Sequence, residues 1–120
     1  MESGVVSQVS YDKREENGWT IWSISGSLDI NTSLETEEQG QKIYASAEKM
    51  AVDLSGIKYI SSAGLRILMR FGKRAKKDGK DFALVAAKGM AATVLKEAKM
   101  DLVVSVLPSC EELESVGMSF

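Results

Sequence analysis

The side chains with the clearest chemical potential in this sequence are two adjacent serines, Ser61 and Ser62, which follow an apolar run and precede an amphipathic stretch. The pattern predicts a strand-to-helix junction. Both hydroxyls then lie beside unpaired backbone N–H groups and the positive end of the helix dipole. A phosphate is locally tolerated there, and it brings about −1.5 to −2 charges and three acceptor oxygens. The serine pair is either a phosphoacceptor site or simply a helix cap.

A glycine close to the serines, Gly64, fits both interpretations. Because glycine has no Cβ, an incoming backbone or nucleotide can approach the hydroxyls closely. The same property allows a tight contact between the helix and the sheet beneath it. Gly64 therefore leaves the two alternatives open.

The absence of histidine restricts the enzymatic alternatives. The 120 residues contain no histidine and one cysteine, Cys110. Ser-His-Asp and Cys-His hydrolases are excluded, as are a histidine phosphocarrier and the commonest zinc sites. There is no Walker loop and no GxGxxG motif, and a Ser-Lys pair would need a buried lysine, whereas none lies in an apolar run. We expect a protein that is not an enzyme and holds no metal or cofactor.

The composition is that of one ordinary globular domain covering residues 1–120, with 44% hydrophobic residues and a formal net charge of −2. A pI near 5.2 argues against direct binding to nucleic acid, which requires a strongly basic surface. No stretch approaches about 20 apolar residues, and the N-terminus does not read as a secretory signal. These features predict a cytoplasmic protein without membrane insertion.

The elements that position the serines are predicted from periodicity and turn residues. The chain opens with a hairpin around Asn17-Gly18, a favoured tight-turn pair. A first helix starts at Thr32 or Ser33, where either hydroxyl can serve as the cap, and Leu34 is among its apolar contacts. The expected elements are strands 5–15 and 19–25, a helix to about residue 49, strand 50–54, a helix from residue 65 to about 77, strand 81–86, helix 90–99, strand 102–107 and a short final helix capped by Ser109.

Strands that alternate with helices imply parallel neighbours joined by right-handed crossovers. The expected fold is therefore α/β, with a mixed β-sheet of about five strands and about four helices. Trp19 and Trp22 are three residues apart, so they point to opposite faces of their strand. We expect Trp22 near the edge of the sheet or on the packing surface of the hairpin.

Two segments make the pattern specific. The stretch from Val52 to Arg66, VDLSGIKYISSAGLR, closely resembles the phosphorylation loop of the STAS family. The stretch from Ile24 to Asp29 resembles the second short signature of that family, a strand ending in a Gly-x-Leu-Asp turn. In a parallel α/β layout both segments lie at corresponding strand ends, where ligands and partners usually bind. The resemblance extends over nearly the whole chain and implies the STAS fold.

The resemblance implies an anti-sigma factor antagonist. Such a protein, when unphosphorylated, binds an anti-sigma factor and thereby frees a sigma factor. The anti-sigma factor acts as an ATP-dependent serine kinase whose phosphorylation ends the binding, and a PP2C-type phosphatase restores it. The partner-binding residues carried over are Leu28, Asp29, Asn31, Ser61, Ser62, Ala63, Gly64, Leu65 and Arg66.

The chain departs from the family pattern at one position. Many members carry the phosphorylated Ser or Thr immediately before the glycine, where this chain has Ala63. We favour Ser62 as phosphoacceptor, on the expectation that it presents its hydroxyl from the N-cap, and Ser61 is the second choice. A constitutive binding module with neither serine phosphorylated is the alternative. Asp29 is read either as an acidic neighbour of the acceptor serine or as a cap for the following helix.

Two other functional classes compete with this interpretation. A response-regulator receiver is disfavoured because the strand before Asp29 ends in Gly26-Ser27 and not in the acidic pair that holds magnesium. Within the family, a free-standing STAS component of a lipid or anion transporter, or of a stress-signalling scaffold, stays open. The lysines and arginines from Arg66 to Lys77 form either a solvated helix face or a surface that steers an acidic partner.

Overall fold

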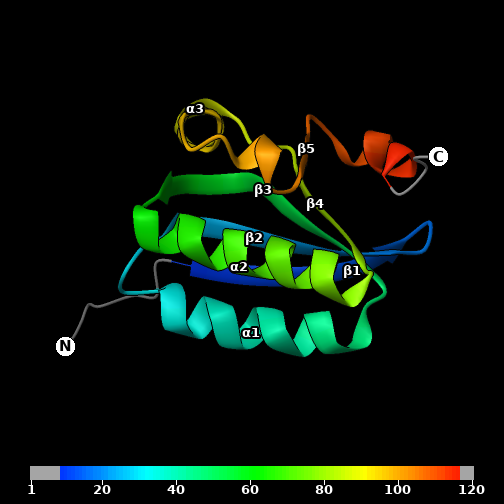
Figure 1. Cartoon of the computed structure of the whole chain (residues 1–120). Helices are drawn as coiled ribbons and strands as arrows, with labels where there is room; N and C mark the ends of the chain where they lie inside the picture. Colours follow the sequence, from blue (N-terminus) through cyan, green and yellow to red (C-terminus); the bar gives the residue numbers. More distant parts are fainter. Residues whose placement is uncertain (1–8, 117–120) are drawn as a thin grey trace.

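The computed structural model describes residues 9–116 as a mixed five-stranded sheet covered by helices (Figure 1). The α/β fold expected from the sequence is confirmed, with three α-helices within residues 9–116 instead of about four. The elements in chain order are β1 Val9–Glu16, β2 Trp19–Leu28, α1 Ser33–Ser46, β3 Lys49–Ile60, α2 Ser62–Asp78, β4 Asp81–Val85, α3 Gly89–Glu97, the 3-10 helix η1 Met100–Leu102, β5 Ser105–Leu107 and the 3-10 helix η2 Cys110–Ser115.

The N-terminal hairpin forms as predicted. β1 pairs antiparallel with β2, and Asn17 and Gly18 at the turn have φ angles of 53° and 86°. These positive values are those of a type I′ turn, whose twist matches that of the strands it joins. Residues 5–8 of the expected first strand lie outside the described residues.

The remaining strands are parallel and lie in the sheet in the order in which they occur in the chain, β1-β2-β3-β4-β5. Every crossover therefore advances in the same direction, and right-handed crossovers place all three α-helices on one face. The main core joins Tyr44 of α1, Phe71 of α2 and Leu95 of α3 to that face. A smaller cluster on the opposite face is covered by Leu113 of η2.

The two tryptophans point to opposite faces, as expected, and Trp22 lies on the packing surface of the hairpin, the second of its two expected places. It is 1% exposed in the main core, whereas Trp19 belongs to the smaller cluster. The reason is the strand order: β1 covers the outer side of β2, and Tyr11 from β1 stacks on Trp22 at 5.8 Å. The hairpin thus encloses Trp22 within the sheet.

Two boundaries before the serines differ from the predictions. α1 ends at Ser46, so Lys49 begins β3 and is not the end of the helix. β3 does not stop at Leu54 but continues through Ser55 and Gly56 to Ile60. Its partner β2 keeps pairing with it across two register shifts, with Ser25 opposite Gly56. Tertiary pairing extends the strand beyond the point where local turn residues predicted its end.

The last third of the chain also differs in detail. α3 runs from Gly89 to Glu97, and Lys99 then adopts a left-handed conformation with φ 55°. Leu102 belongs to η1 and is 76% exposed, so it is not part of the last strand. Ser109 precedes η2 without a side-chain capping bond, and the short final helix is 3-10. Among residues 9–116, no helix is both long and apolar enough to cross a bilayer.

Candidate functional site

The two segments singled out from the sequence meet at one edge of the sheet. β2 and β3 are paired up to Leu28 and Ile60, and the Ser61 N–H donates to the Leu28 carbonyl at 2.9 Å. Figure 1 shows α1 and α2 starting side by side at this edge. The expectation that the Gly-x-Leu-Asp turn and the segment from Ser61 to Gly64, here called the serine loop, lie at corresponding strand ends is confirmed.

Ser61, and not Ser62, is the N-cap of α2. Its backbone is extended, its Oγ accepts from the Gly64 N–H at 3.5 Å, and its carbonyl accepts from the Leu65 N–H at 2.9 Å. The capping position expected for Ser62 is therefore corrected by one residue. Because β3 stays paired to Ile60, the chain can leave the sheet only at Ser61, and this fixes the cap. The half-buried Ser61 hydroxyl is already used to begin the helix.

Ser62 is the first residue of α2, and its side chain is exposed. Within residues 9–116, its hydroxyl has no hydrogen-bond partner. It lies in the first turn, where backbone N–H groups lack helical acceptors and the helix dipole favours negative charge. An incoming phosphoryl group can reach this oxygen without breaking the cap that Ser61 provides.

Gly64 allows a tight contact between α2 and β2. A Cβ at this position would lie 2.6 Å from the Leu28 carbonyl oxygen and 2.7 Å from the Leu28 Cγ. Gly64 is buried and Leu28 is fully buried. Both side-chain positions lie beneath the serine loop and hold α2 against β2, and their role in partner binding stays a prediction. Ala63 is half-buried beside them.

Asp29 organises the loop between β2 and α1. Its Oδ1 accepts from the backbone N–H groups of Asn31 at 2.9 Å and Thr32 at 3.2 Å. Thr32 Oγ1 accepts from the Asp29 N–H at 3.0 Å and donates to the Ser27 carbonyl at 2.8 Å. Thr32 therefore occupies the N-cap position without a side-chain capping bond. The loop is held by its own polar groups, and this favours the capping interpretation of Asp29 while Asn31 stays exposed.

Two exposed apolar side chains border the same edge, and sequence reasoning missed them as site residues. Ile30, in the loop, is 74% exposed, and Leu34, in the first turn of α1, is 70% exposed. Leu34 was expected to pack inward, but the buried stripe of α1 is Thr36, Gly40 and Tyr44. That spacing of four was the available signal, since it leaves Leu34 outside the stripe.

The basic residues of α2 are not equivalent. Arg70 pairs with Glu37 of α1 at 3.4 Å, and Arg74 pairs with Asp78 at 3.6 Å. Arg66 is exposed, and none of the carboxylates between residues 9 and 116 forms an ion pair with it. Arg66 follows Ser62 by four residues, so the two share one helix face. Leu65, beside them, is half-buried and packs against the core.

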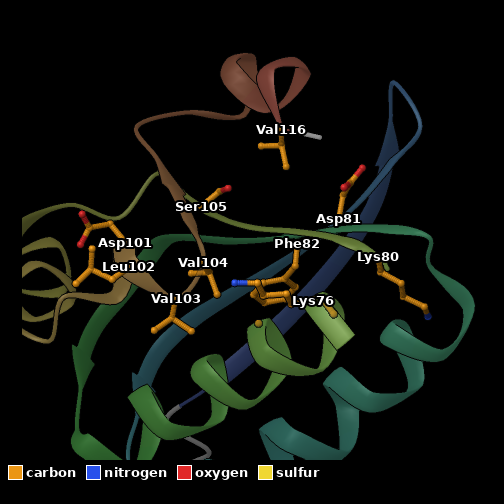
Figure 2. Close-up of a pocket in the computed structure, with 12 residues that line it drawn as sticks. Lys76, Lys80, Asp81, Phe82, Asp101, Leu102, Val103, Val104, Ser105 and Val116 are labelled. Carbon is orange, nitrogen blue, oxygen red and sulfur yellow. The ribbon is translucent and has the colours of Figure 1, made fainter. Parts of the chain in front are cut away.

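A hollow of about 310 Å³ lies at the C-terminal end of α2, away from Ser62 (Figure 2). Its lining comes from the end of α2, the start of β4, the η1 to β5 stretch and Val116. The Lys80 ammonium group donates to the Tyr44 carbonyl at 2.6 Å, so it is already bound. None of the predicted site residues lines this hollow.

Across residues 9–116, no three carboxylates or thiols gather as a group able to hold a metal ion.

Comparison with known proteins identifies the family. A family model described as "Mlab, STAS domain" matches residues 14–107. The chain belongs to the STAS domain family. The resemblance seen in the two sequence segments is thereby confirmed, and the match spans β2, β3 and the serine loop of this STAS domain.

Solved structures share the fold of this STAS domain. An anti-sigma factor antagonist from Mycobacterium paratuberculosis superposes with a TM-score of 0.80 at 23% identity, covering 89% of this chain and 92% of that one. A putative anti-sigma factor antagonist from Thermotoga maritima gives 0.79 at 19% identity, covering 88% and 92%. A sulfate transporter family protein from Wolinella succinogenes gives 0.68 at 13% identity, covering 86% and 87%.

Proposed function

We propose that this STAS domain is an anti-sigma factor antagonist that is switched by phosphorylation of Ser62. The observation that carries the proposal is the exposed Ser62 hydroxyl, unbonded within residues 9–116, at the start of α2. In the unmodified form the chain binds an anti-sigma factor through the edge formed by the β2–α1 loop and the start of α2. Binding releases the sigma factor in the cytoplasm, and the chain catalyses no reaction itself.

The kinase is the anti-sigma factor itself, and it transfers the γ-phosphoryl group of ATP to the Ser62 oxygen. The P–O bond to ADP breaks as the new P–O bond forms, and the hydroxyl proton is lost. The resulting phosphate places up to two negative charges on a surface that held a small neutral group. A partner seated on that surface is expelled by charge and by the cost of desolvating the phosphate. A PP2C-type phosphatase hydrolyses the ester and restores binding.

Ser61 is the less suitable acceptor. Its Oγ accepts the Gly64 N–H, and its backbone N–H is bonded to Leu28. Phosphorylation there would place the phosphate on the atom that caps α2 and at a half-buried position next to the tight contact at Gly64. We therefore assign the capping of α2 to Ser61 and the phosphorylation to Ser62.

The test is phosphopeptide mass spectrometry after incubation of the purified chain with ATP and, one at a time, the serine-kinase anti-sigma factors of its own organism. We expect phosphate on Ser62 in the parent and in Ser61→Ala, and none in Ser62→Ala. Modification of Ser61 alone would refute the assignment of Ser62. No incorporation by any of these kinases would refute the phosphorylation switch and leave a constitutive binding module.

A second function has a specific observation in its favour. The matching family model is described as "Mlab, STAS domain", and a sulfate transporter family protein shares the fold. A free-standing STAS component of a lipid or anion transporter would use the same edge of the sheet to dock on a transporter subunit, and a stress-signalling scaffold would use it to dock on a neighbouring subunit. Stable co-purification with a membrane transporter, in place of a soluble kinase, would favour the transporter assignment.

A further inference from the structure

The helices α1 and α2 run side by side, and the line along which they meet, here called the seam, leads to the serine loop. Both start at the same edge of the sheet (Figure 1), and the pair between Glu37 and Arg70 bridges them. A groove of about 290 Å³ follows the seam, with Gln41, Phe71 and Arg74 in its lining together with the bridging pair. The seam is thus hollowed on the side away from the sheet.

The ion pair between the helices relates the position of an apolar side chain on α1 to that of a cationic side chain on α2. Leu34 precedes Glu37 by three residues, and Arg66 precedes Arg70 by four. Residues three and four apart lie on one helix face, about one turn from each other. Leu34 and Arg66 therefore lie on the two sides of the seam, one turn nearer the serine loop than the ion pair.

One further helical turn toward the N-termini of the two helices leads to the serine loop and to the loop before α1. Ser62 lies one turn beyond Arg66 at the start of α2, and Ile30 lies in the turn that precedes Leu34. We call Ile30, Leu34 and Arg66, with the seam groove, the seam surface. Of the five large apolar side chains that are exposed between residues 9 and 116, two belong to this surface. Contiguous exposed apolar groups mark protein-interaction sites, and arginine is enriched at the hot spots of interfaces.

We infer that the seam surface docks an acidic and apolar patch of the anti-sigma factor, and that Arg66 is the group for which the partner and a phosphate on Ser62 compete. The inference rests on the proposed function. Arg66 has no carboxylate partner within residues 9–116, while Arg70 and Arg74 are already paired. The seam surface is thus electrostatically incomplete at Arg66, and a partner carboxylate completes it.

Phosphorylation supplies the missing anion from within the chain. A phosphate on Ser62 is four residues from Arg66 on the same helix face, the spacing at which opposite charges interact in a helix. Pairing with the phosphate makes Arg66 less available to a partner carboxylate, and the added charge repels that carboxylate. The modification therefore acts by weakening a binding group as well as by adding an unfavourable one.

The first test needs no partner. Phosphoserine is installed at position 62 by genetic encoding, and the second pKa of the phosphate is followed by phosphorus NMR. Pairing with Arg66 favours the dianion, so Arg66→Gln raises this pKa by roughly 0.3 unit, as expected for an exposed helical ion pair. Lys77→Gln on the same helix is the matched control and leaves the value unchanged. Equal pKa values in the parent and Arg66→Gln would overturn the role of Arg66.

The second test measures docking by calorimetry, with the anti-sigma factor kinase that phosphorylates the chain as the probe. Leu34→Ala and Arg66→Glu each weaken binding of the unmodified chain at least tenfold. Leu102→Ala, at a leucine 76% exposed outside the seam surface, keeps parent affinity. Parent affinity in Leu34→Ala would overturn the docking surface. Failure of every kinase to bind the unmodified parent would refute the proposed function and the docking with it, while the phosphate titration still decides the role of Arg66.

Discussion

Gly64 of α2 packs so closely on Leu28 of β2 that a single added carbon would lie 2.6 Å from the Leu28 carbonyl oxygen. The same carbonyl accepts the Ser61 N–H at 2.9 Å. One backbone oxygen therefore faces both the tight helix–sheet contact and the cap that begins α2. The position of the serine loop depends on this contact, because any shift of α2 away from Leu28 would also move the first turn that carries Ser62.

Gly64→Ala is expected to destabilise the fold and to disturb the serine loop. Forcing a Cβ into this contact costs about 2 kcal/mol, since backbone and not a flexible side chain must move. Urea denaturation followed by tryptophan fluorescence measures the loss. The matched control is Ala63→Gly, which removes a methyl group next to the contact without adding one. A Gly64→Ala variant as stable as the parent would show that α2 sits further from β2 than described.

The two serines are expected to differ in their effect on stability. Ser61→Ala removes the cap of α2, whose bond is long at 3.5 Å, and lowers the free energy of unfolding by no more than the typical loss for an N-cap, about 1 kcal/mol. Ser62→Ala removes a hydroxyl that has no partner within residues 9–116 and changes stability by less than about 0.5 kcal/mol. Thermal unfolding of both variants checks this order, and the reverse order would exchange the roles assigned to Ser61 and Ser62.

Ser62→Asp is expected to weaken binding to the anti-sigma factor, whereas Ser62→Ala leaves binding intact but blocks phosphate incorporation. A carboxylate adds a single charge, less than the phosphate does, so the loss is partial, about tenfold or roughly 1.4 kcal/mol. Calorimetric titration of both variants with the purified partner gives the two affinities. Ser62→Asn, similar in size to the aspartate but uncharged, is the control. Equal affinity for the Asp and Asn variants would remove charge as the cause.

Tyr44 and Asp78 predict a dependence of stability on pH at the far end of the helix pair. Burial, followed by the hydrogen bond to Asp78 at 2.6 Å, raises the pKa of Tyr44 from its ordinary value to about 12. The fold therefore favours the neutral phenol: this stabilisation is complete below about pH 10, where the unfolded tyrosine is also neutral, and is lost as the pH rises through about 12. Ultraviolet titration of the phenolate measures the pKa of Tyr44, with Tyr59→Phe as the control.

The same hydrogen bond acts in the opposite direction on the acid. The Tyr44 hydroxyl, and then the neighbouring cations led by Arg74, lower the pKa of Asp78. In Tyr44→Phe the pKa of Asp78 should rise toward its ordinary value, as measured by carbon NMR of the carboxyl group. An unchanged Asp78 pKa in that variant would show that the cations alone set it.

Local signals in the sequence predicted the features that depend on local chemistry. Asn17 and Gly18 specify their turn because both tolerate positive φ. The α/β order and the adjacency of the Gly-x-Leu-Asp turn to the serines followed from the alternation of strands and helices. The family followed from two short segments that agree with each other.

The features that were missed depend on contacts between distant segments. Ser61 and not Ser62 is the cap because β3 stays paired with β2 up to Ile60. The local sequence does not indicate how far the pairing with a partner strand extends. Leu34 is exposed because the sheet accepts α1 on its Thr36 and Gly40 face, where a Cβ at Gly40 would lie 2.7 Å from Phe71.

The placement of every α-helix on one face of the sheet gives η2 a role out of proportion to its six residues. The opposite face carries Trp19, Ile21, Ala51 and Val85, and Leu113 is the buried η2 side chain that packs with them. Cleavage of the chain just before Cys110 would uncover this apolar face of the sheet while leaving the serine loop intact. The cut form is thus expected to self-associate through this face, which is opposite the one that carries α2.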